Sequence, residues 1–264
     1  MIIDFHTHAF ADAIAERAIS KLEGVSNLKA YSNGTISNLV EFYEKNNIDK
    51  CVLLPIATKP TQQTTINNWA VAQKSEKIIP FGSIHPDATD VFDELERIKS
   101  LGLKGIKLHP DYQGFFIDDE KLIPIYKKCA ELGLVVIFHA GYDPLSPDLV
   151  HAMPEASARV FKQVPNMTMV LAHLGGMMHF DDVEKYLVGL EGEIYFDTAY
   201  IDGTIDKNQL ERIIKNHGAN RILFGSDFPW HTPNMEYDLI QSLDITEKEK
   251  NLILSENAMR ILGL

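Results

Sequence analysis

The stretch MIIDFHTH, residues 1–8, is a short apolar, β-branched run that ends in two histidines. Such a run predicts a buried β-strand. Side chains two positions apart lie on the same face of a strand, so His6 and His8 share one face. If Ile3 and Phe5 face surrounding helices, both imidazoles point into the interior of the fold. Two neighbouring neutral imidazoles suit a borderline divalent metal ion, so the stretch predicts a strand that ends in part of a metal site.

Similar apolar runs recur along the rest of the chain and alternate with segments of helical periodicity. Strands that alternate with helices imply parallel pairing and right-handed crossovers. Eight such units close a barrel, whereas six would favour an open sheet. We therefore expect an α/β fold, a (β/α)8 TIM barrel, with strands near residues 1–5, 50–56, 78–84, 103–108, 134–138, 167–172, 193–196 and 221–225.

The helical segments between these runs carry start and stop signals. Gly102 and Gly133 stand just past two of them, where a residue in the left-handed conformation is wanted. The tail, residues 252–264, is expected to be helical and to seal one end of the barrel. The clearest helices are expected at residues 37–47 (behind a serine cap), 89–100 and 118–132.

The composition fits a single TIM-barrel domain over residues 1–264. A barrel of this kind needs about 250 residues, and 45% apolar residues allow a large core. The net charge of −12 argues against nucleic-acid and membrane partners, because phosphates would be repelled. Cys51 and Cys129 have no neighbours at metal-ligand or redox spacing and are expected to be buried free thiols. With neither an export signal nor a spanning helix in view, we expect a cytoplasmic protein.

Histidines gather where barrels carry out their chemistry, at the carboxyl ends of the strands. The fifth, sixth and eighth expected strands are almost wholly apolar, and each ends in one ionisable group: His139, His173 and Asp227. Burial of such groups is costly unless they are paired or bound to metal, so a shared cation explains all three. Of the ten histidines, those that end or directly follow an expected strand are His6, His8, His85, His109, His139 and His173.

With these residues in place, the chain resembles the amidohydrolase superfamily. More narrowly, it resembles the amidohydrolase-related family that includes aminocarboxymuconate-semialdehyde decarboxylase-like enzymes. The resemblance implies a distorted (β/α)8 barrel of the metal-dependent hydrolase type with one divalent ion, usually zinc, with manganese as the alternative. It runs the full length of the chain and rests on the motifs DFHTH (4–8), GIKLHP (105–110), LAHLGG (171–176), GSDFP (225–229) and ENA (256–258).

The resemblance also implies roles for individual residues. The metal-ligand positions of members with one ion match His6, His8, His139 and Asp227. The catalytic positions match His173, which orients or deprotonates the bound water, and Asp227, which accepts its proton. In members with two ions the strand-six histidine binds the second ion, and a carboxylated lysine on strand four, here Lys107, bridges the pair. We expect one ion, with two as the alternative, and we expect Asp4 to act from behind the ligands.

Substrate contacts are harder to assign. Decarboxylase members hold substrate carboxylates with a cationic group, often arginine, but no arginine of this chain stands at the carboxyl tip of a strand. Lysine can serve as a point charge but lacks the bidentate fork of arginine. The two histidines that precede prolines either line the pocket or bond their own loops. The substrate-binding candidates are Lys107, His109, His85, Lys59 and Asp197.

The expected function is hydrolysis, in which zinc-activated water attacks an amide, lactone or ester carbonyl of a small molecule. The alternative is non-oxidative, metal-dependent decarboxylation of a small unsaturated or aromatic acid by a carboxy-lyase. A third hypothesis, from another class, is a catalytically silent barrel that binds metal and a small molecule. Such a binder needs a shaped pocket but no group that activates water. The resembling family favours a homodimer as the assembly.

Overall fold

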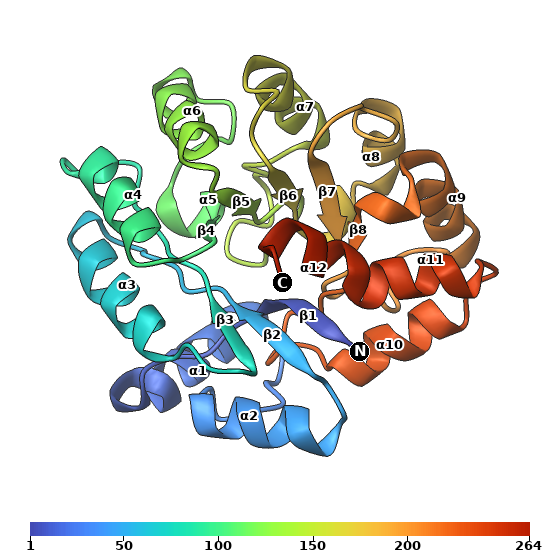
Figure 1. Ribbon diagram of the computed structural model, residues 1–264, viewed down its shortest axis with the longest axis horizontal. Coiled ribbons are helices and arrows are strands. Elements are labelled where there is room, and N and C mark those ends of the chain that lie inside the picture. Colours follow the sequence, from blue (N-terminus) through green and yellow to red (C-terminus); the bar gives the residue numbers. More distant parts are fainter.

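Eight parallel strands close into a barrel (Figure 1). The strands are β1 (Ile3–Thr7), β2 (Lys50–Leu53), β3 (Ile78–Pro80), β4 (Gly105–Leu108), β5 (Val135–Phe138), β6 (Met169–Leu171), β7 (Ile194–Asp197) and β8 (Ile222–Leu223). The computed structural model describes all 264 residues. Two hydrogen-bonded groups run β1-β2-β3 and β4-β5-β6-β7-β8. Isolated parallel bridges join them, Gly82 with Ile106 and Thr7 with Phe228. The predicted (β/α)8 barrel with its eight strands is confirmed.

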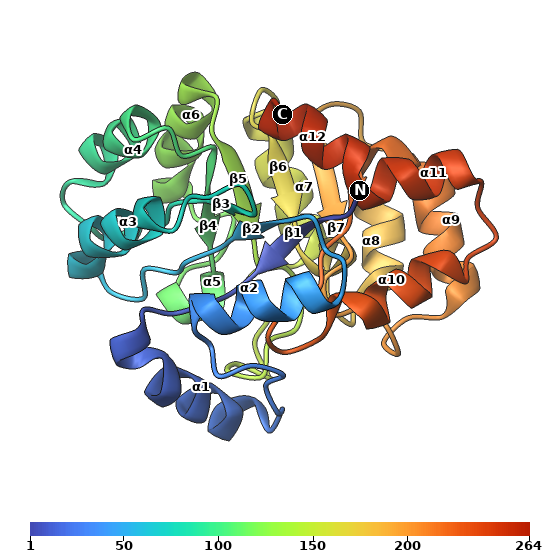
Figure 2. The same ribbon diagram turned by 60° about the horizontal axis from the view of Figure 1, so that its bottom comes forward.

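Helices surround the strands on the outside of the barrel (Figure 1). Figure 2 shows α12 at one end of the barrel and α1 towards the other. None of the helices is long and apolar enough to cross a membrane. The helices are α1 (Asp12–Ser26), α2 (Ile36–Lys45), α3 (Gln63–Ala72), α4 (Val91–Ser100), α5 (Pro110–Gln113), α6 (Ile123–Leu132), α7 (Pro154–Gln163), α8 (Phe180–Tyr186), α9 (Lys207–His217), α10 (Pro233–Gln241), α11 (Glu247–Asn251) and α12 (Asn257–Leu262).

The helix boundaries follow local chemistry. The cap of α2 is Thr35, whose hydroxyl accepts from the amide of Asn38, so the predicted serine cap is wrong by two positions. Gly133 ends α6 in the left-handed conformation, and Gly102 follows α4 with φ of 76°, as the sequence predicts. Both cysteines are free and buried.

Two apolar layers hold the barrel together. The larger cluster lies between the strands and the helices around them. A smaller cluster fills the barrel itself and gathers side chains from seven strands or the residues next to them. Ala258 and Leu262 of α12 join this inner cluster, so the C-terminal helix closes one end of the barrel as predicted.

One sequence-based expectation about β1 is wrong. Ile3 and Phe5 belong to the inner cluster and do not face the helices. Asp4 points outward instead, where its carboxylate accepts from the hydroxyl of Tyr43 on α2 at 2.6 Å. The pairing register between β1 and β2 shifts between Asp4 and Thr7. This irregularity breaks the strict alternation along the strand, so His6 reaches the barrel mouth although Phe5 also points inward.

Candidate metal centre

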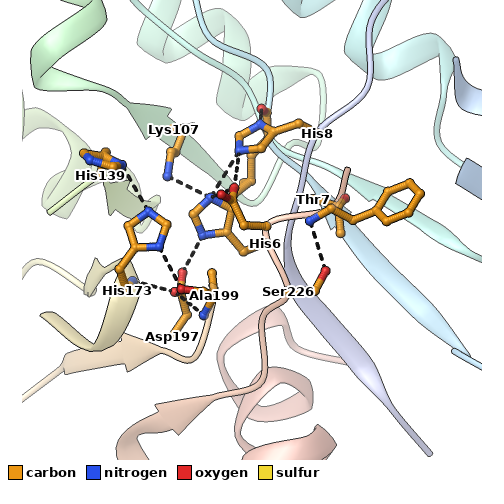
Figure 3. Close-up of polar contacts among 12 residues, drawn as sticks. His6, Thr7, His8, Lys107, His139, His173, Asp197, Ala199 and Ser226 are labelled. Atoms are coloured by element: carbon orange, nitrogen blue, oxygen red, sulfur yellow. Dashed lines mark hydrogen bonds and ion pairs between the residues drawn. The ribbon is translucent and has the colours of Figure 1, made fainter. Parts of the chain in front are cut away.

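Four imidazoles and one carboxylate meet at the carboxyl ends of β1, β5, β6 and β8. Figure 3 shows the histidines pointing toward one another beside Lys107 and Asp197. His6 lies within β1, His8 follows it, His139 follows β5 directly, and His173 begins the turn after β6. The structure thus brings together residues from distant parts of the sequence, as the barrel geometry predicts.

The outer nitrogens of the first histidine pair are engaged by acceptors. Nδ1–H of His6 donates to Oδ2 of Asp197 at 2.8 Å. Nδ1–H of His8 donates to the carbonyl of Leu54 at 2.9 Å. Each neutral ring then carries its lone pair on Nε2, and the two Nε2 atoms lie 3.2 Å apart. Two lone pairs at this distance repel each other unless a positive charge lies near both.

The second pair has the same design. Nδ1–H of His173 donates to the carbonyl of Ala199 at 2.8 Å. Nε2–H of His139 donates to the carbonyl of Tyr142 at 3.3 Å. The remaining nitrogens, Nε2 of His173 and Nδ1 of His139, face each other at 3.1 Å. In metal sites the outer partner of a histidine fixes its tautomer in this way and leaves the inner nitrogen free to bind.

Asp227 joins the first histidine pair. Its Oδ1 lies 3.2 Å from Nε2 of His8 and 3.4 Å from Nε2 of His6. The ligand atoms of these three residues all lie within 4.8 Å of one another, close enough to share one ion. His139, the fourth predicted ligand, lies outside this group and pairs with His173. The structure therefore places the five predicted residues in two adjoining groups.

Backbone strain marks the same rim of the barrel. His173, Tyr200 and Asp227 have φ values of 56°, 57° and 66°. This left-handed conformation costs a residue with a side chain about 1–2 kcal/mol. These residues follow β6, β7 and β8, so the strain lies beside the candidate site, where such strain commonly serves function.

The electrostatics favour neutral imidazoles. Burial, together with the positive charge of Lys107, holds the pKa of His6 well below its ordinary value. Burial likewise lowers the pKa of His139 well below that value. Neutral histidine is the form that binds metal. The donor set, four inward lone pairs and a carboxylate, therefore fits a divalent ion.

Lys107 is the one ammonium group inside this cluster. Its Nζ lies 3.2 Å from Nε2 of His6, and its side chain is fully buried. Burial lowers its pKa to about 8, so the group is mostly protonated at neutral pH. Its position suits a cation facing substrate and a bridge between two ions alike.

The other substrate-binding candidates have different surroundings. Asp197 is fully buried, and its carboxylate accepts from His6 Nδ1 and from the amides of His173 and Ala199. It therefore orients the two histidines, and a contact with substrate stays a prediction. Lys59 is exposed beside the short helical turn Pro60–Gln62, and no hydrogen bond or ion pair joins its side chain to the site. Nδ1 of His85 accepts from the amide of Asp87 at 3.2 Å, which is a loop-bonding role.

A second histidine–carboxylate group lies behind His139. His109, His139 and Asp143 bring their ligand atoms within 4.8 Å of one another, and all three are buried. The imidazoles of His109 and His139 stack at 4.2 Å with an interplanar angle of 10°. Asp143 was missed from the sequence, because a single aspartate in a loop carries no periodic signal. Its only cue is its position four residues after His139.

Fold and site together define a class: (β/α)8 barrels with a histidine-rich polar centre at the carboxyl ends of the strands. The sequence profile of the family described as Amidohydrolase matches residues 3–264. The chain belongs to this family.

Proteins similar to this chain in sequence include a decarboxylase and a dihydroorotase. The chain is 26% identical over 227 residues to 2-amino-3-carboxymuconate-6-semialdehyde decarboxylase of Dictyostelium discoideum, which covers 74% of this chain and 63% of that protein. It is 25% identical over 166 residues to dihydroorotase of Helicobacter acinonychis, which covers 58% of this chain and 48% of that protein. The matches thus span less than two thirds of the length of either relative.

Solved structures share the fold over the whole chain. A variant of 5-carboxyvanillate decarboxylase from Novosphingobium aromaticivorans, solved with bound manganese, superimposes with a TM-score of 0.72. The alignment covers 100% of this chain and 97% of that one at 15% sequence identity. At this identity the likeness establishes the barrel fold alone.

Proposed function

We propose that this protein is a divalent-metal-dependent decarboxylase of a small unsaturated or aromatic carboxylic acid. The observation that carries the metal requirement is the set of inward-facing lone pairs on His6, His8, His139 and His173 beside the carboxylate of Asp227. The decarboxylase relative matches more of this chain than the dihydroorotase does, which supports loss of carbon dioxide over hydrolysis. This reverses the order of preference that the sequence alone suggested.

The residues that would hold the ion are His6, His8 and Asp227, with His139 on the neighbouring side. Histidine and carboxylate ligands suit zinc or manganese. When bound, the ion supplies a positive charge that stabilises negative charge on the substrate. We infer that the site holds a single ion, either zinc or manganese.

The protein's own residues account for the remaining chemistry. In the reaction R–CO2⁻ + H⁺ → R–H + CO2, the carbon–carbon bond breaks and its electron pair stays on the substrate carbon, which takes up a proton. The ammonium group of Lys107 places a positive charge where it can pair with a substrate carboxylate. Nε2 of His173 is the atom that holds and delivers the proton, while its Nδ1–H stays fixed on the carbonyl of Ala199.

Hydrolysis is the second candidate, and a specific arrangement favours it. Lys107 stands beside His6, and His139 faces His173, which is the layout expected if two ions share a carboxylated lysine. The similarity to dihydroorotase points the same way. In that case His139 and His173 would hold the second ion.

A substrate panel separates these functions. The protein, stripped with a chelator and reconstituted with zinc or manganese, is incubated with hydroxylated and methoxylated benzoates, unsaturated acids, dihydroorotate and lactones. We expect release of carbon dioxide from at least one acid, abolished by the chelator and restored by the metal. Hydrolysis without carbon dioxide release would contradict the proposal. If a compound binds but none is turned over, the result would instead support a catalytically silent barrel that binds metal and a small molecule.

A further inference from the structure

We propose that Asp143 is a positioning residue for the candidate metal centre, holding His139 and His109 as one stacked unit. This inference rests on the proposed function, because it assumes that His139 binds the metal. Asp143 lies in the loop after β5, four residues beyond His139, and is buried with 5% of its surface exposed.

One oxygen of Asp143 lies close to two imidazoles. Oδ2 lies 3.6 Å from Nε2 of His139 and 3.5 Å from Nε2 of His109. The other oxygen, Oδ1, accepts from the amide of Leu145 at 2.7 Å, which fixes the carboxylate to its own loop. The carboxylate therefore lies on the outer side of His139, opposite the nitrogen that faces His173.

Aromatic stacking fixes the orientation of the two imidazoles that lie close to Asp143. The ring of His109 lies between Tyr112, at 3.8 Å and 13°, and His139, at 4.2 Å and 10°. Imidazole lone pairs lie in the ring plane, and two nearly parallel rings have no common plane close by. One ion could not meet both lone pairs, so this group does not form a second metal site. The N–H bonds lie in the same ring planes, so Oδ2 of Asp143, at 3.5 and 3.6 Å from the two Nε2 atoms, acts on both rings through its negative charge, which favours the Nε2–H form of each.

The loop that carries Asp143 is anchored on its far side. The amide of Tyr142 donates to the carbonyl of Met177 at 2.9 Å, and the amide of Met177 donates to Ala140 at 2.9 Å. Gly141 has φ of 87°, and a Cβ there would meet the amide nitrogen of Met177 at 2.1 Å. The backbone therefore has little freedom, and the carboxylate is held where both imidazoles meet it.

The two imidazoles depend on Asp143 unequally. Nε2–H of His139 donates to the carbonyl of Tyr142 at 3.3 Å, and Oδ2 of Asp143 lies farther away, at 3.6 Å. For Nε2 of His109 the only nearby carboxylate is that of Asp143, at 3.5 Å, and Nδ1 of His109 is buried without a hydrogen-bond partner. Loss of the carboxylate should therefore release His109 from its Nε2–H tautomer, loosen the stack and let the ring of His139 rotate.

Two measurements test the inference. Ring ¹⁵N chemical shifts of the metal-free protein report the tautomers, and competition with a chelator reports the affinity for Co²⁺. In Asp143→Ala we expect His109 to leave the Nε2–H form and the affinity to fall about 10- to 100-fold, the usual effect of removing an outer partner of a metal ligand. Asp143→Asn, whose amide oxygen can still accept one N–H, should recover part of that affinity. This variant provides the same test if Asp143→Ala does not fold.

Asp111→Asn is the matched control. Asp111 lies 3.9 Å from Nδ1 of His109, on the opposite side of the same ring, and pairs with His151 at 2.8 Å. Its loss should leave Co²⁺ affinity unchanged. Equal losses in the Asp111 and Asp143 variants, or unchanged affinity and tautomers in Asp143→Ala, would overturn the inference. Wild-type protein that binds no metal at all would instead contradict the proposed function.

Discussion

Nε2 of His173 lies 3.1 Å from Nδ1 of His139, and neither nitrogen carries a hydrogen when both rings are neutral. The opposite N–H groups are committed to the carbonyls of Ala199 and Tyr142. His6 and His8 repeat this relationship through their Nε2 atoms. The ammonium group of Lys107 lies 3.2 Å from Nε2 of His6, so the remaining lone pairs, on His8, His139 and His173, need a further positive charge, which a metal ion would supply.

His139→Ala and His173→Ala should separate metal binding from catalysis. Loss of His139 removes a proposed ligand, so metal content should fall. Loss of His173 should leave one equivalent bound but lower turnover about 10²- to 10⁴-fold, the usual contribution of a positioned acid–base group. Elemental analysis and steady-state rates measure both. Loss of a second metal equivalent in His173→Ala would indicate a two-ion site with Lys107 as the bridge.

Asp4 should support the site from outside the barrel. Its carboxylate accepts from the Tyr43 hydroxyl at 2.6 Å, from the Ser226 amide at 3.0 Å and from the His6 amide at 3.1 Å. It thereby ties the strand of His6 to the loop of Asp227. Asp4→Ala should weaken metal binding about 10- to 100-fold.

Tyr43→Phe removes only one donor to Asp4 and should destabilise the fold by about 1–3 kcal/mol with little change in metal affinity. Isothermal titration and urea unfolding distinguish these effects. Equal metal affinity in Asp4→Ala and wild type would argue against this support.

Two glycines offer a matched test of backbone constraint beside His139. Gly141 and Gly102 both have positive φ, but a Cβ on Gly102 meets nothing within 4 Å, whereas one on Gly141 meets backbone at 2.1 Å. Gly102→Ala should cost about 1–2 kcal/mol. Gly141→Ala should cost more than about 4 kcal/mol or prevent folding. Urea unfolding measures both costs. Similar losses of stability in the two variants would show that the loop after β5 can shift to accommodate the added Cβ.

Glu236 should make stability depend on pH. Burial raises its pKa from an ordinary 4.5 to about 7, against the opposing effect of His231 at 3.2 Å. The folded state thus binds this proton more tightly than the unfolded state, and stability falls as pH rises from 4.5 to 7. Replacement of Glu236 by glutamine removes this titratable carboxyl group. As pH rises from 4.5 to 8, the unfolding free energy of Glu236→Gln should increase relative to that of the wild type by up to about 3 kcal/mol. A difference that stays constant with pH would contradict this.

The sequence predicted those parts of the structure that follow from periodicity. Apolar runs alternating with helical segments specify eight strands, and a polar group at the end of an apolar strand specifies the barrel mouth. His6, His8, His139, His173 and Asp227 were found in this way. Ile3 and Phe5 were misplaced because a register shift interrupts the alternation after Asp4, and no residue type announces such a shift.

The surroundings of the ligands could not be predicted, because they come from loops and backbone atoms. The carbonyls of Leu54, Tyr142 and Ala199 fix three imidazoles, and a carbonyl has no signature in the sequence. Asp197 was recognised as a candidate, but its partners depend on how β7 lies beside β1 and β6. Asp143 was missed for the same reason, since its role depends on a stack formed by two separate loops.

Metal analysis of the purified protein tests the central claim most directly. After removal of loosely bound ions, the wild-type protein should retain one tight equivalent of zinc or manganese, measured by plasma mass spectrometry. A variant that combines His8→Ala with Asp227→Asn should retain none, although its circular dichroism matches that of the wild type. Wild-type protein that binds no divalent ion, or a double variant that still holds one, would contradict the assignment of these side chains as a metal centre.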